Sequence, residues 1–258
     1  MSKGLEIVPI KDKTKLEVRQ SPTPHLPRTP LRMLASAASF SGKSTTIANM
    51  ILNKRMYRDV WDSIWIFSQS VDHDATWGEV KKYVRESLNK DPSKHFFSEW
   101  DGEAIRKIIS DQAAIVKFHK DEGHKKSHQI LLVIDDFADR PEIVHQSNGG
   151  GILNSLFTRG RHFMISTIIC TQKPTLISTT IRENATSLII WKQRSSKALE
   201  VLLSEYDAMV PGGKASLLAM YEYATKEPYA FLLMDLLRPS SEAFFKNFNV
   251  RLIPKESA

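Results

Sequence analysis

From residue 31 onward, short and largely apolar runs alternate with longer stretches in which apolar residues recur every three or four positions. The runs predict buried strands of a parallel sheet, because both faces of such strands are covered. They lie at residues 31–37, 63–67, 130–134, 164–171 and 187–191. The longer stretches predict helices at residues 45–52, 76–88 and 195–206, with another that begins after Asp101. Strands and helices in alternation predict a mostly parallel α/β sheet with helices on both faces.

The last part of the chain breaks this alternation. Two apolar stretches, residues 217–223 and 229–236, flank the turn-forming sequence Thr225-Lys226-Glu227-Pro228. Two such stretches joined by a short turn predict an antiparallel hairpin at the edge of the sheet. Aromatic residues follow, and we expect them to pin a C-terminal helix to the domain; they are Phe244, Phe245 and Phe248.

Residues 1–30 differ from the rest of the chain in proline content and charge. Pro22, Pro24, Pro27 and Pro30 favour an extended chain over a helix. Seven basic and three acidic side chains in residues 1–32 supply +4 of the net charge of +7. We therefore expect a basic, proline-rich arm at residues 1–30 and one compact domain at residues 31–258. The basic surplus suits contact with a nucleic-acid backbone as well as it suits a solubilising tail.

The composition excludes several classes of protein. The one cysteine, Cys170, lies in an apolar run, so an intrachain disulfide is excluded and a reducing compartment is expected. No apolar run approaches the roughly 20 residues that span a bilayer, and residues 1–32 contain no apolar signal-peptide segment. We therefore expect neither a membrane span nor a secretory signal.

The strongest local signal is the sequence Ala37-Ala38-Ser39-Phe40-Ser41-Gly42-Lys43-Ser44, between a predicted strand and a predicted helix. It fits the phosphate-binding loop pattern except that Ala37 replaces the first glycine. In such a loop, backbone N–H groups surround the phosphates, Lys43 reaches the β- and γ-phosphates, and the Ser44 hydroxyl binds Mg²⁺. The predicted nucleotide-binding residues are Ser39, Phe40, Ser41, Gly42, Lys43, Ser44 and Thr45. A turn of small residues before a helix is the alternative.

Two carboxylates, Asp135 and Asp136, end the apolar run at residues 130–134. Open α/β sheets bind ligands at the carboxyl ends of their strands, so both side chains are expected beside the phosphate loop. Hydrolysis of a nucleoside triphosphate needs a carboxylate for Mg²⁺ and a group that orients the attacking water. We assign Asp135 to Mg²⁺ and Asp136 to the water. With the phosphate loop about ninety residues earlier, the pair predicts a RecA-like P-loop NTPase domain.

Polar residues around the run at residues 164–171 complete the predicted site. Gln172 follows the run and is expected to hold the attacking water or to sense hydrolysis; a loop amide bonded to nearby backbone is the alternative. Arg159 and Arg161 precede the run, and Arg182 lies in the next loop. One of these arginines could stabilise transition-state charge at a neighbouring subunit's γ-phosphate. Each taken alone is better explained as a surface arginine.

In this order, the motifs resemble those of the genome-packaging ATPases of large double-stranded DNA viruses, the poxvirus-type family within the FtsK–HerA group. The matching residues are Ser41-Gly42-Lys43-Ser44, Ile134-Asp135-Asp136, Thr158-Arg159-Gly160-Arg161-His162, Ser166, Thr171-Gln172 and Ile181-Arg182-Glu183-Asn184. The arginine-then-glutamine pattern is the distinctive part. Two residues depart from the group, since Ala37 replaces a glycine and Asp136 stands where glutamate is common.

The resemblance implies an ATP-driven motor, with ATP and Mg²⁺ at the subunit interfaces of a pentameric or hexameric ring. It implies that the ring moves double-stranded DNA into a preformed capsid and contacts capsid or portal-vertex proteins. It also implies Arg159 or Arg161 as the arginine that acts on the neighbour, Gln172 as the sensor, and a location in the host cytoplasm, the virus factory or the virion. Two alternatives stay open: a cellular-type translocase or helicase of the same group, and a non-enzymatic nucleotide switch in capsid assembly.

Overall fold

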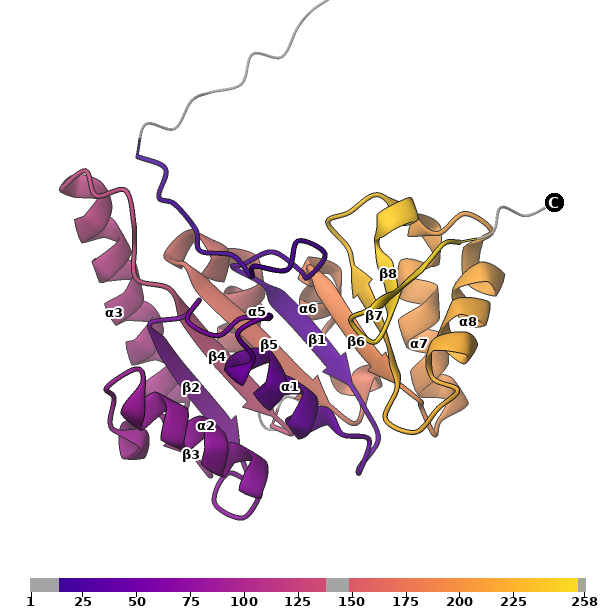
Figure 1. Cartoon of the computed structure of the whole chain (residues 1–258), viewed down its shortest axis with the longest axis horizontal. Coiled ribbons are helices and arrows are strands. Elements are labelled where there is room, and N and C mark those ends of the chain that lie inside the picture. Colours follow the sequence, from indigo (N-terminus) through magenta and orange to yellow (C-terminus); the bar gives the residue numbers. More distant parts are fainter. Residues whose placement is uncertain (1–13, 138–148, 255–258) are drawn as a thin grey trace, which may run out of the picture.

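The computed structural model describes residues 14–137 and 149–254, and a sheet forms its centre. The described strands lie in the order β3-β2-β4-β5-β1-β6-β7-β8-β9 (Figure 1). Their bounds are β1 Arg32–Ser36, β2 Ser63–Ser68, β3 Phe96–Phe97, β4 Ile130–Asp135, β5 Ile165–Thr171, β6 Ser187–Trp191, β7 Phe231–Asp235, β8 Phe244–Lys246 and β9 Val250–Leu252. Neighbours from β3 to β6 are parallel, and β7, β8 and β9 extend the edge in antiparallel pairs. The predicted parallel sheet with an antiparallel edge is confirmed.

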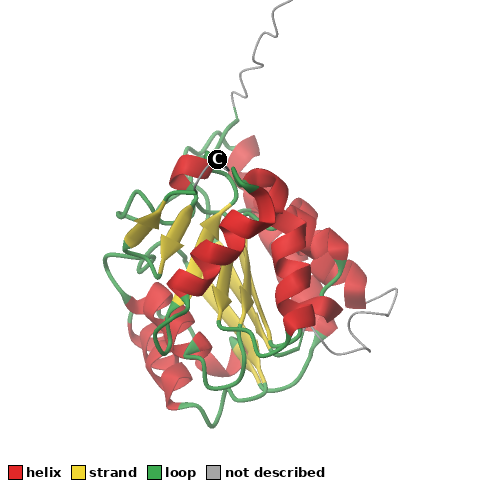
Figure 2. Ribbon diagram, turned by 90° about the vertical axis from the view of Figure 1, so that its right-hand side faces the viewer, coloured by secondary structure: helices red, strands yellow, loops and turns green. Residues whose placement is uncertain are grey.

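Helices cover both faces of this sheet (Figure 2). One face is covered by α1 (Lys43–Leu52) and α2 (Ala75–Glu86). The other is covered by α3 (Gly102–Asp121), α5 (Gly149–Arg159), α6 (Thr179–Asn184), α7 (Ser196–Tyr206) and α8 (Gly213–Ala224). None of the described helices is long and apolar enough to cross a membrane.

The apolar runs form strands because both faces of the sheet are buried. In β4, Ile130, Leu132 and Ile134 pack under the layer that contains α3 and α5. Leu131 and Val133 point the opposite way and pack under α1 and α2. Successive strand side chains alternate between faces, so a strand covered on both sides must be apolar at every position. Polar residues are therefore found where such strands end, at the edge of the sheet formed by the carboxyl ends of the parallel strands.

Side-chain caps fix where several helices begin. Asp101 accepts a hydrogen bond from the N–H of Ala104, as the sequence predicted. Ser195 caps α7 in the same way through the N–H of Ala198. Each such cap contributes about 0.5–2 kcal/mol. Asp101 follows β3 and Ser195 follows β6, so these caps mark where the chain changes from strand to helix.

The predicted C-terminal hairpin is wrong in its first half. Residues 217–223 lie in helix α8, where Leu217, Met220, Tyr221 and Ala224 are buried. Their spacing of three, four and seven positions is helical, and it outweighs the apparent strand composition of the run. β7 is a strand as predicted, but it pairs with β6 and not with the residues before it.

The predicted C-terminal helix is also wrong, because Phe244 and Phe245 lie in strand β8. Phe244 is buried on the α8 side of the sheet, whereas Phe245 is buried on the α1 side. Adjacent residues point to opposite faces of a strand, so this strand can bury both rings. A helix lying on one face of the sheet could not do so.

The described part of the predicted arm, residues 14–30, packs against the domain. Leu16 and Leu26 are buried. Arg19 forms an ion pair with Asp62, and the N–H of Glu17 donates to the carbonyl of Lys125 over 2.7 Å. Residues 14–30 contain no helix, as their prolines predicted, but the segment is not extended throughout, because it bends and turns at residues 22–26, where the N–H of Leu26 donates to the carbonyl of Thr23 over 3.1 Å. Its leucines add contacts that hydrophobic periodicity does not reveal. Residues 1–13 lie outside the described residues.

Candidate nucleotide-binding site

The phosphate loop joins the carboxyl end of β1 to the start of α1. β1 pairs with β5 on one side and with β6 on the other. The chain leaves β1 toward β2 in one half of the sheet, whereas it leaves the neighbouring β5 toward β6 in the other half, and open α/β sheets bind ligands at such a reversal. The N–H of Ala37 donates to the carbonyl of Thr171 over 3.0 Å, so the loop begins fixed to β5.

The loop conformation explains how alanine is tolerated at its first position. Within the loop, the described residues with positive φ are Phe40, at 63°, and Gly42, at 82°; Ala37 is not among them. A side chain at residue 37 therefore meets no left-handed strain. Gly42 caps α1 and has no side chain, so the cap residue offers no side-chain acceptor to the first N–H groups of the helix. Those N–H groups, with the helix dipole, are suited to an anion.

Lys43 lies between the two predicted carboxylates. Its Nζ is 2.9 Å from Oδ1 of Asp135 and 2.6 Å from Oδ1 of Asp136. Lys43 and Asp135 are buried, whereas Asp136 is partly exposed. The structure thus brings together three predicted site residues that are about ninety positions apart in the sequence.

Burial and charge act in opposite directions on this cluster. Burial alone would lower the pKa of Lys43, but the acidic groups of Cys170, Asp135 and Asp136 outweigh it and raise that pKa well above its ordinary value. Burial raises the pKa of Asp135, because the nearby Lys43 offsets only part of the desolvation. Lys43 is therefore a permanent cation at neutral pH, held by two carboxylates that a phosphate would have to replace.

Gln172 connects the end of β5 to the same cluster. Its Nε2 donates to Oδ2 of Asp136 over 3.0 Å, and its Oε1 accepts from the Ser39 hydroxyl over 2.7 Å. Gln172 therefore forms hydrogen bonds with side chains of the site. In the alternative interpretation, its amide would instead bond to the backbone of the loop. Its amide links the phosphate loop to the carboxylate expected to orient water.

The oxygen atoms at this edge fit a hard divalent cation such as Mg²⁺. Oδ2 of Asp135 accepts from the Ser68 hydroxyl over 2.9 Å. Its Oδ1 is buried without a hydrogen-bond partner, although Lys43 is close enough for an ion pair. Ser44, whose hydroxyl is the other predicted ligand, lines the cavity beside the phosphate loop, whereas Asp135 is not among the residues that line this cavity. A carboxylate and a hydroxyl are oxygen ligands of the kind that Mg²⁺ takes beside phosphates.

A cavity of about 570 Å³, here called the phosphate cavity, lies beside the phosphate loop. Residues of the phosphate loop and α1 form one wall, and the opposite walls contain Asp136 and Gln172. The side near α2 is polar and contains Ser70, Asp74 and Thr76. All the predicted nucleotide-binding residues line this cavity; they are Ser39, Phe40, Ser41, Gly42, Lys43, Ser44 and Thr45.

Arg159 and Arg161 lie at the opposite edge of the sheet from the phosphate loop, where the parallel strands have their amino ends. Arg159 ends α5, and Arg161 lies in the turn Gly160–Phe163 that precedes β5. Both are exposed. Gln172 follows the far end of β5, whose seven residues span roughly 20 Å. Neither arginine therefore reaches the phosphate loop of its own chain.

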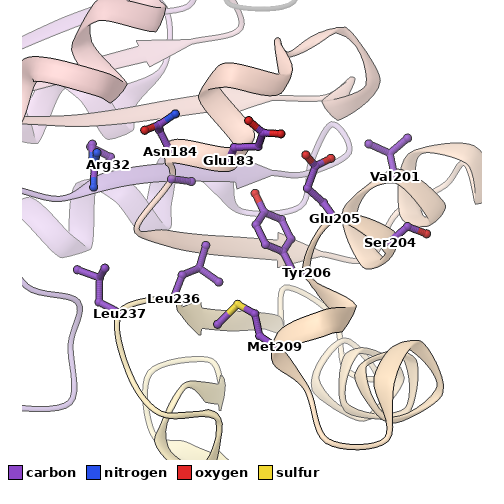
Figure 3. A pocket seen from close by; sticks show the side chains of 11 residues that line it. Arg32, Glu183, Asn184, Val201, Ser204, Glu205, Tyr206, Met209, Leu236 and Leu237 are labelled. Atoms are coloured by element: carbon purple, nitrogen blue, oxygen red, sulfur yellow. The ribbon is translucent and has the colours of Figure 1, made fainter. Parts of the chain in front are cut away.

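Near this edge lies a cavity of about 830 Å³ (Figure 3). Arg32 lines it, and burial lowers the pKa of Arg32, with a further lowering from the charge of Arg161. Arg182, the third candidate, is held within its own chain, because its Nε donates to Glu205 over 2.9 Å and its Nη1 to the carbonyl of Ile177. This leaves Arg159 and Arg161 as the exposed candidates.

Several residues at the site were not predicted from the sequence. Ser68 ends β2, and its place after an apolar run was a signal of the same kind as that of Asp135. Arg194 follows β6 and, together with Phe40 and Ser41 of the phosphate loop, lines a second cavity. Tyr229 lies against Gly42, and no local pattern indicated that contact.

The family described as Poxvirus A32 protein matches residues 100–230, just over half of the 258 residues. This chain belongs to the poxvirus A32 protein family. The match includes Asp135, Asp136 and Gln172 but not the phosphate loop, which the fold of this A32-family chain places beside them. No curated protein matches the chain.

Solved structures resemble the A32-family chain in fold. The genome packaging NTPase B204 from Sulfolobus turreted icosahedral virus 2, in complex with ATP-gammaS, is 18% identical, with a TM-score of 0.52 over 84% of this chain and 97% of B204. EssC (ATPases 2 and 3) from Geobacillus thermodenitrificans is 13% identical, with a TM-score of 0.56 over 93% of this chain and 47% of EssC.

The pCW3 conjugation coupling protein TcpA, with ATPgS, is 19% identical, with a TM-score of 0.50 over 79% of this chain and 57% of TcpA. The A32-family chain spans about half the length of the EssC and TcpA chains. At these identities the likeness shows the fold, which is that of P-loop NTPases.

Proposed function

We propose that this A32-family chain is an ATP-driven motor that translocates viral double-stranded DNA into a preformed capsid. The observation that carries the proposal is the convergence of Lys43, Asp135, Asp136 and Gln172 around the phosphate loop. These are the charges and hydrogen-bonding groups that phosphoryl transfer to water requires. The genome-packaging function named for B204 supports the choice of DNA and capsid.

In this proposal, ATP binding releases Lys43 from its carboxylates. The β- and γ-phosphates replace Asp136 as the partner of the ammonium, so Asp136 becomes free to accept a proton or a hydrogen bond from water. Gln172 already bonds to Asp136 and holds that carboxylate in place. Ser44 and Asp135 would hold Mg²⁺, which neutralises charge on the phosphate oxygens when bound.

Transition-state charge on the γ-phosphate would be met by a neighbouring subunit. A ring places two different patches of adjacent subunits in contact. Arg159 and Arg161 lie far from their own phosphate loop and are exposed, as a residue that acts on a neighbour must be. The charge of Arg161 lowers the pKa of Arg32, so an anion from the neighbour would relieve repulsion between the two guanidinium groups.

Replacing Asp136 by asparagine tests the role of this carboxylate. We expect Asp136→Asn to bind ATP at least as tightly as the wild type, because Lys43 loses one competing anion. Hydrolysis should slow by roughly 10²-fold or more, the scale of a lost general base or water-positioning group. Single-turnover hydrolysis and equilibrium ATP binding separate the two effects.

Asp72→Asn is a matched control. It also removes an ion pair between an aspartate and a lysine, Lys81, but Asp72 lies outside the phosphate cavity. It should keep wild-type turnover. Wild-type hydrolysis by Asp136→Asn would contradict the role given to Asp136.

The motor itself is tested by ATP hydrolysis with and without long duplex DNA, together with the mass of the assembly. We expect DNA to stimulate turnover, and we expect a ring-sized assembly. ATP binding without turnover would favour a non-enzymatic assembly switch. DNA-stimulated turnover with strand separation would favour a helicase, whereas directional movement on intact duplex favours the packaging motor.

Such a motor would work where capsids are filled, in the host cytoplasm or virus factory, and contact the capsid or its portal vertex.

A further inference from the structure

Tyr229 is an exposed aromatic residue in a strained backbone conformation beside the phosphate loop. The residue is 70% exposed and has a φ of 64°, which bulky residues rarely adopt. Its ring lies on Gly42, where a Cβ atom would be 3.3 Å from Cδ1 of the tyrosine. Strain of this kind persists where the surrounding structure enforces it, and it clusters at ligand sites. The phosphate chemistry described above does not use this side chain.

The phosphate cavity adjoins a second cavity, of about 630 Å³. The two cavities share the lining residues Ala38, Ser39, Phe40, Ser41 and Tyr229. Residues 191–194 at the end of β6 and residues 225–230 before β7 form the remaining walls of the second cavity. Phe40 is 96% exposed and, like Tyr229, has a positive φ. Two aromatic side chains therefore stand at the boundary between the cavities.

The direction of a bound nucleotide follows from the order of the strands. Asp136 and Gln172 follow β4 and β5, on one side of β1, whereas the second cavity lies at the ends of β6 and β7, on the other side. A nucleotide with its γ-phosphate at Asp136 therefore extends its base across the loop toward Tyr229. A third cavity, of about 380 Å³ beside α1, shares only Thr45 with the phosphate cavity.

We propose that the second cavity binds the base and ribose of a nucleoside triphosphate, with Tyr229 and Phe40 as the stacking surfaces. The proposal rests on the proposed function in that the phosphate loop binds such a nucleotide. Aromatic side chains bind bases through the faces of their rings. Lys192, Arg194 and Lys226 line the same cavity with one acidic residue, Glu227, so its walls carry a net positive charge that attracts an anionic nucleotide. Tyr229 is thus a residue that determines affinity for the nucleoside and not a catalytic residue.

The test compares the binding of ATP and of inorganic tripolyphosphate, each with Mg²⁺, by titration calorimetry. The wild type should bind ATP more tightly than tripolyphosphate, because only ATP carries a base. Tyr229→Gly removes the ring and suits the positive φ, so the variant should fold at least as stably as the wild type. Its affinity for ATP should fall roughly 5- to 150-fold, the effect of one lost base–aromatic stack. Its affinity for tripolyphosphate should not change, and Tyr229→Phe should retain wild-type affinity for both.

Two results would overturn the base-binding proposal while leaving the proposed function intact. One is equal affinity of the wild type for ATP and tripolyphosphate. The other is an equal loss of affinity for ATP and for tripolyphosphate in Tyr229→Gly, which would show that the ring only supports the loop through Gly42. Binding of neither ligand by the wild type would instead overturn the proposed function.

The third cavity supplies a matched aromatic control. Phe248 lines it and packs edge-on against Phe231, with ring centroids 5.0 Å apart. Phe248→Leu removes a ring there and should leave ATP affinity unchanged. A selective loss of ATP affinity in Phe248→Leu, with none in Tyr229→Gly, would place the base in the third cavity and overturn the proposal.

Discussion

Lys43→Ala is expected to abolish ATP turnover. Lys43 begins α1 at the phosphate loop and carries a permanent positive charge between Asp135 and Asp136. Lys192 and Lys226 also lie at this edge, but they line the second cavity and not the phosphate cavity. Without Lys43, the two carboxylates face the incoming β- and γ-phosphates with no cation between them. Steady-state phosphate release measures the loss.

The same substitution should also destabilise the fold. Removing one partner of a buried ion pair typically costs about 3–5 kcal/mol, because the other charge is left buried and unpaired. Burial already raises the pKa of Asp135, and the loss of Lys43 raises it further. A carboxyl whose pKa is raised by folding stabilises the fold when protonated, and this contribution is lost as the pH rises through that pKa. The stability gap between Lys43→Ala and the wild type should therefore narrow as the pH falls, which thermal unfolding at several pH values measures.

A double variant separates the loss of activity from the loss of stability. Lys43→Ala with Asp136→Asn removes one of the two carboxylates that would repel each other, so it should recover part of the stability and none of the turnover. Lys107→Ala breaks an exposed ion pair with Asp111 on α3 and is the control for removing a lysine elsewhere. Because Asp136→Asn alone is already slow, turnover in the double variant is compared with that variant, and equal turnover in the two would show that Lys43 serves the fold and not the phosphates.

The parallel part of the fold could be predicted from the sequence, because each buried strand is a short apolar run that differs from its helical neighbours in period. α8 could not be predicted in the same way. Its apolar residues are dense enough to resemble a strand, and only their burial at three-, four- and seven-residue spacing identifies a helix. β8 was misassigned for a related reason. Phe244 and Phe245 pack on opposite faces of the sheet, and a sequence does not state how many faces are available to bury a ring.

The residues of the candidate site likewise include some that the sequence predicts and one that it does not. Lys43, Asp135, Asp136 and Gln172 could be predicted because each follows or precedes an apolar run, and parallel strands bring their carboxyl ends to one edge. Tyr229 could not, since its contact with Gly42 depends on how β7 pairs with β6, far from the phosphate loop in the sequence. The distance of Arg159 and Arg161 from the loop also follows from the sequence, because both precede the apolar run of β5 and Gln172 follows it.

Arg159 or Arg161, at the amino ends of the parallel strands, is expected to act on the neighbouring subunit's nucleotide. An arginine that stabilises the transferring phosphoryl group is worth roughly 10³–10⁵ in turnover. Arg161→Ala or Arg159→Ala should therefore keep ATP binding, because neither side chain reaches its own phosphate loop, and should lose hydrolysis on that scale. Arg85→Ala, at an exposed position in the last turn of α2, makes the same charge change and should keep both.

Mixing two inactive variants decides between action on the neighbour and action within the chain. Lys43→Ala subunits keep their arginines, and Arg161→Ala subunits keep their phosphate loops. Mixed rings contain some interfaces with an intact loop on one subunit and an intact arginine on the next, so partial hydrolysis should return. Absence of recovery in subunits shown to co-assemble would mean either that the arginine acts within its own chain or that the ring needs every site intact. Titrating the arginine variant into the wild type distinguishes these two, because only a ring that requires every site loses activity steeply when few variant subunits are present.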